Sequence, residues 1–197
     1  MRRIIPLLLV ALSIPTWPQT QTKPDNEVRQ AFSPGGKIYL RLSPGGYTIS
    51  GTNDNNIVVT YDAANKDSLK RVRVRIAATG SHADVAFSNT PRNNFHATIE
   101  VPARSDLEAN LAAGEIVIDG VEGNKDVEVY AGRIEIKIPH PEEYGHREAS
   151  VRAGSIQASA FDVSKGGLFR SFEQNGRGKY RLRAHVTTGE IDLVGSK

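Results

Sequence analysis

The sequence predicts an all-β protein whose C-terminal half stacks short, glycine-cornered strands into a parallel β-solenoid. Apolar and polar residues alternate through much of the chain, which is the period of a half-buried strand. Glycine and proline are frequent, with 18 and 10 copies in 197 residues, and they interrupt every window that could form a long helix. A glycine-centred motif also recurs. The same alternation and the same frequent turn residues also allow an antiparallel β-sandwich, which is the alternative.

The first residues have the pattern of an export signal. Arg2 and Arg3 form a positive region, and the apolar run 4–12 that follows is too short to span a bilayer. We therefore expect a signal peptide at 1–19, cleaved after Ser13 or nearer Trp17. A buried N-terminal strand and an uncleaved anchor are the alternatives.

The rest of the chain is predicted to form one domain behind a linker. The polar, proline-bearing stretch 20–36 is predicted to be flexible. Alternation begins at Lys37, and we assign 37–195 to one β domain. Within it, 37–104 supplies N-terminal strands and 105–195 supplies the solenoid repeats.

Charge and composition exclude several classes of protein. The formal net charge is +3, and removal of two arginines with the signal peptide lowers it to +1, so no nucleic-acid partner is expected. Cysteine is absent, which excludes disulfides, thiolate zinc sites and cysteine nucleophiles. Since no second long apolar run follows, we expect no transmembrane segment beyond the signal peptide. The predicted location is the periplasm, the cell surface or the extracellular space.

Four segments of the second half share one pattern around a glycine. Positions five and three before this glycine, and two and four after it, are apolar in every copy. We predict that the glycines are repeat corners, with a weaker fifth copy upstream: Gly45, Gly114, Gly132, Gly154 and Gly189. The isoleucines two residues after the last four glycines are predicted to form an inward ladder: Ile116, Ile134, Ile156 and Ile191. The spacing predicts successive coils in chain order, with a hairpin around Asn175-Gly176 inserted before the last copy.

The order of these features resembles a known family. An export signal precedes a β region with a strand ending in Val-Pro (Thr98–Pro102), followed by the glycine-centred repeats and a final TGEIDL segment (Thr188–Leu193). This order resembles the bacterial exported adhesin-like family of domains of unknown function, over about 37–195. The resemblance implies a β-solenoid in an envelope or extracellular setting, and it implies no established activity.

Two groups of residues contain the residue types of a metal site or of a pair of catalytic acids. The loop from His140 to His146 holds two imidazoles and two glutamates, but its proline predicts a solvated connection in place of a metal site. Several acids are predicted on the outer face, where Arg133 and Lys137 are their neighbours, so a soluble charged face is expected in place of paired catalytic acids. These acids are Glu115, Asp119, Glu135, Glu190 and Asp192. We predict no catalytic, cofactor-binding or metal-binding residue, and no cofactor.

A basic stripe is the remaining candidate site. Arg71, Arg73 and Arg75 occupy alternate positions and therefore one face of a strand. One interpretation is a contact with a polyanion, such as an acidic polysaccharide or phospholipid head groups. The other is an edge strand that charge protects from aggregation.

The residues and the resemblance together predict a non-enzymatic exported envelope or surface protein, an adhesin-like binding or structural module. Its expected partner is a cell-surface polysaccharide or another envelope protein. A polysaccharide-active enzyme that uses a solenoid groove is one alternative, and an envelope signalling or accessory protein is the other.

Overall fold

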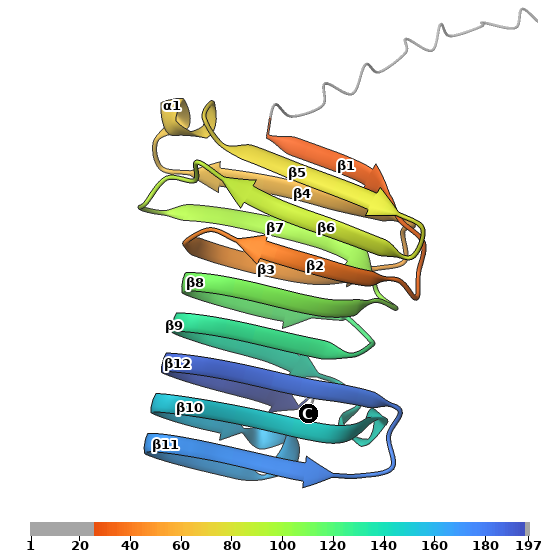
Figure 1. Ribbon diagram of the computed structural model, residues 1–197, viewed down its shortest axis with the longest axis vertical. Coiled ribbons are helices and arrows are strands. Elements are labelled where there is room, and N and C mark those ends of the chain that lie inside the picture. Colours follow the sequence, from red (N-terminus) through yellow and green to blue (C-terminus); the bar gives the residue numbers. More distant parts are fainter. Residues whose placement is uncertain (1–25, 196–197) are drawn as a thin grey trace, which may run out of the picture.

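The computed structural model describes residues 26–195, which form an all-β chain with a mixed sheet of 12 strands (Figure 1). In chain order the strands are β1 (Glu27–Ala31), β2 (Lys37–Leu42), β3 (Gly45–Thr52), β4 (Asn56–Ala63), β5 (Arg73–Thr79), β6 (His82–Ser88), β7 (Phe95–Pro102), β8 (Asp106–Asp119), β9 (Lys125–Ile138), β10 (Tyr144–Ala158), β11 (Val163–Asn175) and β12 (Tyr180–Gly195). The short helical segments are α1 (Lys66–Leu69), η1 (Pro141–Glu143) and η2 (Ser159–Phe161). Within this described part, no helix is long and apolar enough to cross a membrane. The predicted signal peptide at 1–19 lies outside it.

The long strands bend in the middle, so each contributes to a front and a back wall of the stack (Figure 1). The first half of β8 pairs with β2 and its second half pairs with β3, which makes β2 and β3 together equivalent to one bent strand. We call each bent strand, or each such pair of strands, a rung. The rungs β6/β7, β2/β3, β8, β9, β12 and β10 follow one another in the stack, and all their pairings are parallel. Antiparallel pairs occur at the two ends, between β4, β5 or β1 and their neighbours and between β10 and β11.

The five corner glycines lie side by side in one column. The register pairs Gly45 with Gly114, Gly114 with Gly132, Gly132 with Gly189, and Gly189 with Gly154. A Cβ atom added to Gly132 would lie 1.8 Å from the carbonyl oxygen of Gly114. The φ angle of Gly132 is +141°, which residues with a side chain rarely adopt. Glycine is therefore required here both by the backbone conformation and by the closeness of the next rung.

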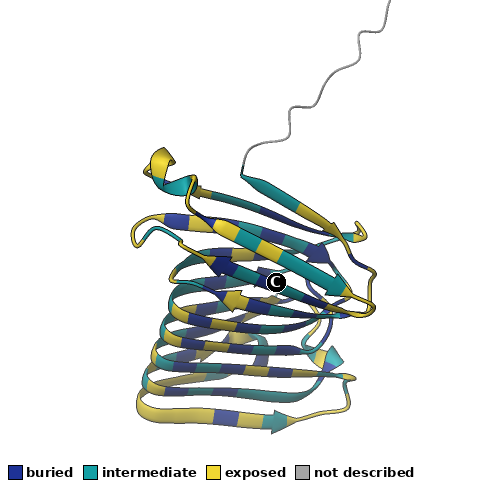
Figure 2. Cartoon of the chain, turned by 45° about the horizontal axis from the view of Figure 1, so that its top comes forward, coloured by how far each residue is buried: buried dark blue, intermediate teal, exposed yellow. Residues whose placement is uncertain are grey.

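The core lies between the two walls, and the isoleucines form one of its rows. Ile116 pairs with Ile134, Ile134 with Ile191, and Ile191 with Ile156, and all four are fully buried. Buried and exposed positions alternate along the rungs (Figure 2). Burying one such side chain contributes roughly 1.5–3 kcal/mol, so the row is a large stabilising element.

The order of rungs in space differs from their order in the chain. β12 lies between β9 and β10, and no hairpin forms around Asn175-Gly176, because β11 pairs with β10 and not with β12. The side chains of β11 explain this placement. Lys165 and Arg170 stand opposite Ile156 and Val151, where the other rungs carry apolar residues. β11 therefore suits the end of the stack, where it is exposed along nearly all its length (Figure 2).

Part of the predicted linker at 20–36 is instead a strand. β1 pairs antiparallel with β4, placing Val28 opposite Val59, and the following Phe32 is buried. This segment contains few apolar residues. Its strand forms by hydrogen bonding to the edge of β4. The N-terminal strands also continue the stack, since β2 and β3 pair with β8 across the predicted boundary between 37–104 and 105–195.

A buried lysine reaches across the inserted strand. Lys125, the first residue of β9, is 2% exposed, and its Nζ donates to the carbonyl of Gly123 at 3.2 Å and to the hydroxyl of Tyr144. Tyr144 begins β10, so this contact spans β12, which lies between the two strands. Burial lowers the pKa of Lys125 to about 8, against the attraction of Asp106, Glu122 and Glu143.

Replacement of Gly132 by alanine tests the glycine column. We expect Gly132→Ala to reduce the free energy of unfolding by roughly 2–4 kcal/mol, because the new Cβ displaces a backbone carbonyl. Gly80→Ala is the matched control, since Gly80 also has a positive φ of +59° but a Cβ there meets nothing within 4 Å. That variant should lose about 1 kcal/mol from backbone strain alone. Urea unfolding followed by circular dichroism measures both, and equal losses would contradict the steric requirement.

Replacement of Lys125 by methionine tests the buried amine. The folded-state pKa of Lys125 lies below its ordinary value of 10.5, so the unfolded chain binds the proton more tightly and stability rises as pH increases through about 8. We expect the unfolding free energy of the wild type, relative to Lys125→Met, to increase by about 2 kcal/mol from pH 7 to 9.5. Urea titrations across this range measure the difference, and a flat difference would show that the amine is not desolvated.

Candidate anion-binding site

Three arginines border a depression of about 540 Å³ at the end of the stack that carries α1 and β5. Arg71 and Arg73 come from the connection after α1 and from the start of β5, and Arg92 comes from the connection between β6 and β7. Uncharged groups complete the lining: Ser68, Asn89, Thr90 and Pro91. We call this feature the arginine depression.

Local structure orients the two arginines from the β5 side. The side chain of Asn65 caps α1 by accepting hydrogen bonds from the backbone of Asp67 at 2.9 Å and Ser68 at 3.4 Å. The chain then turns, with the Val72 amide donating to the carbonyl of Leu69 at 3.0 Å. Val72 is buried, so its exposed neighbours on either side, Arg71 and Arg73, are directed outward.

The charge in the depression is unbalanced. No carboxylate is among its lining residues, and within residues 26–195 neither Arg71 nor Arg92 forms an ion pair. Arg73 donates from Nη1 to the backbone carbonyls of Lys70 at 2.9 Å and Val72 at 3.1 Å. Guanidinium groups bind carboxylate, phosphate and sulfate through paired hydrogen bonds. The depression is therefore chemically suited to an anion.

The structure brings together only part of the predicted basic stripe. Arg71 and Arg73 line the depression, whereas Arg75 lies farther along β5, opposite Ala86, and is not part of the lining. Arg92 was missed, because it lies in a turn-rich segment about twenty positions away in the sequence. The antiparallel pairing of Arg73 with Ser88 brings that segment beside β5.

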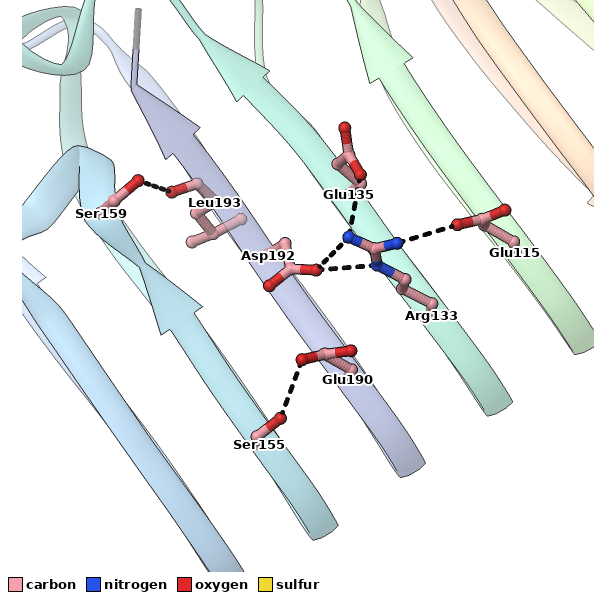
Figure 3. Close-up of polar contacts among 8 residues, drawn as sticks. All are labelled: Glu115, Arg133, Glu135, Ser155, Ser159, Glu190, Asp192 and Leu193. Carbon is pink, nitrogen blue, oxygen red and sulfur yellow. Dashed lines mark hydrogen bonds and ion pairs between the residues drawn. The ribbon is translucent and has the colours of Figure 1, made fainter. Parts of the chain in front are cut away.

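The outward acids surround Arg133 on the back wall (Figure 3). Its Nη2 lies 2.6 Å from Asp192 and 3.1 Å from Glu135, and its Nη1 lies 3.5 Å from Glu115. The hydrogen bond to Asp192 raises the pKa of the Arg133 guanidinium above its ordinary value. This network joins β8, β9 and β12.

The two other predicted outward acids have separate partners. Glu190 accepts a hydrogen bond from Ser155 at 3.2 Å (Figure 3), and Asp119 pairs with Lys137 at 2.7 Å. The outer face of the repeats is thus held by contacts between neighbouring rungs.

The histidines of the 140–146 loop face different partners. His140 lies 3.5 Å from Glu142, while His146 lies on β10 and its Nδ1 is 2.9 Å from the side-chain oxygen of Asn175 on β11. Across residues 26–195, no group of three or more histidines and acids is arranged to hold a metal ion.

Comparison with known proteins yields distant structural likenesses. No family model matches the chain, and no curated protein matches it. A solved structure of a proposed cell adhesion protein from Clostridium sporogenes is similar at 13% identity, over 86% of this chain and 99% of that one, with a TM-score of 0.49. A proposed adhesin from Bacteroides fragilis is similar at 8% identity, over 84% and 95% of the two chains, with a TM-score of 0.34. Likenesses at these scores carry no argument about ligand or activity.

Proposed function

We propose that the chain is a non-enzymatic, exported, adhesin-like binding module whose parallel β-solenoid presents the arginine depression to an acidic polysaccharide. The observation that carries this proposal is the convergence of Arg71, Arg73 and Arg92 on one depression whose lining contains no carboxylate. An anion with several oxygen atoms would supply the hydrogen-bond acceptors and the negative charge that this lining lacks.

The architecture supports a solenoid that acts as a rigid carrier. Six rungs pair in parallel, one glycine column marks the corners of five of them, and one core runs through them. Each of these rungs is hydrogen-bonded to a strand on both sides, which leaves little freedom for large internal motion. The site itself lies on connections, where ligand contacts are commonly placed on rigid scaffolds.

The arrangement of acids supports a binding role over a hydrolytic one. Glycoside hydrolysis requires two carboxyl groups that face one glycosidic bond from opposite sides. Glu115, Glu135 and Asp192 instead share one guanidinium, that of Arg133, on an outer wall. The predicted export signal supports a location where envelope polysaccharides are accessible.

Titration of the mature chain with sulfated and carboxylated polysaccharides tests the proposal. We expect heparin and polygalacturonate to bind with an affinity that falls as salt increases, and neutral dextran not to compete at the arginine depression. Arg92→Ala should weaken binding by about tenfold to a hundredfold, because it removes a charge-assisted contact worth roughly 1.5–3 kcal/mol.

Arg75→Ala is the matched control, since it removes the same charge from the same end of the stack but outside the depression. It should change the affinity by less than about twofold. Equal losses in the two variants would show that diffuse charge, and not the depression, holds the polyanion. Binding to anionic phospholipid vesicles without binding to either polysaccharide would reassign the ligand to a membrane surface.

A further inference from the structure

A second depression, of about 520 Å³, lies on the front wall where β2, β8 and β9 approach their corners. Leu42, Leu111 and Phe87 lie along its floor, where each exposes 7% or less of its surface. Tyr130 of β9 also lines it, and we call it the Tyr130 groove.

Among residues 26–195, Tyr130 is one of four large apolar side chains that are exposed. Its exposed fraction is 68%. It stands two residues before the corner glycine of β9, and the equivalent residues of the neighbouring rungs β8 and β12 are the small Ala112 and Thr187. The ring of Tyr130 is therefore not covered by a large side chain at the equivalent position of either neighbouring strand. The face of an exposed aromatic ring is an apolar surface on which a ligand can stack.

Three polar side chains form a row beside the ring. Arg41, Asn110 and Glu128 are paired in register on β2, β8 and β9, and all three are exposed. Adjacent strands lie about 4.8 Å apart, so the row spans about 10 Å. It offers guanidinium donors, an amide that both donates and accepts, and a carboxylate that accepts.

The row lacks the excess positive charge of the arginine depression. Its one cation, Arg41, is paired with Asp84 at 2.9 Å, and Glu128 is a further carboxylate. An anionic ligand would therefore gain little net attraction here. An uncharged ligand with one apolar face and a rim of hydroxyl groups would match both the ring and the polar row, and a pyranose ring has this form.

We propose that the Tyr130 groove binds a neutral saccharide unit, which stacks on Tyr130 and directs its hydroxyl groups to Arg41, Asn110 and Glu128. The site is separate from the arginine depression and does not depend on an anionic ligand there. The chain would then contact a polysaccharide through two chemically different sites, one for charge and one for a neutral ring.

Titration of the mature chain with neutral hexasaccharides of glucose, mannose and N-acetylglucosamine, followed by saturation-transfer NMR, tests this inference. We expect at least one to bind, with transfer strongest to the ring hydrogens of the sugar. Tyr130→Ala should weaken binding at least tenfold, whereas Tyr130→Phe, which keeps the ring, should stay within threefold. Glu128→Gln, which keeps the shape but removes the charge, should weaken it measurably.

Phe169→Ala is the matched control, because Phe169 is a similarly exposed aromatic residue, at 74%, on β11 and outside the groove. It should leave the affinity unchanged, and so should Arg92→Ala, which separates this site from the arginine depression. Absence of binding to all three sugars would overturn the inference. Equal losses in Tyr130→Ala and Phe169→Ala would also overturn it, since they would indicate unspecific adhesion to exposed rings.

Discussion

Close approach of neighbouring backbones at the corners is the constraint on which the stack depends. At Gly114, Gly132, Gly189 and Gly154, a carbonyl oxygen of the adjacent rung lies within 1.9 Å of the place that a Cβ would occupy. This contact permits only one register, because a slip by one residue would bring a side chain into the column and turn the apolar face outward. The inward isoleucine row and the outward Arg133 network both follow from that register.

The sequence predicted those properties that depend on one rung alone. Alternation showed which side of each strand faces the core, and the glycine spacing showed where each rung bends. The order of rungs could not be predicted, because β9, β10 and β12 carry the same inward pattern and any of them can lie beside another. The charged residues Lys165 and Arg170 were the available sign that β11 belongs at an end. β1 was missed because its two apolar residues, Val28 and Ala31, are too few to show a period.

The sites were less predictable than the fold, since each depends on contacts between segments far apart in the chain. Arg71 and Arg73 were visible as an alternating stripe, but Arg92 joins them only through the pairing of β5 with β6. The outward column that holds Tyr130 could be read from the repeats. That the ring of Tyr130 is uncovered follows only from the structure, which places the small residues Ala112 and Thr187 on the strands beside it. Both sites also occur where the stack is irregular, including the corner at Ser43, whose hydroxyl donates to the carbonyl of Phe87 at 3.0 Å.

The insertion of β12 has a consequence for biogenesis. A ribosome makes β9, β10 and β11 before β12, so a nascent chain holds two long strands whose facing edges have no hydrogen-bond partner. Such edges are templates for pairing with other chains. The edges of β9 and β10 therefore stay unpaired until the sixteen residues of β12 have been synthesised. A chain interrupted before Tyr180 would be a candidate for aggregation or proteolysis.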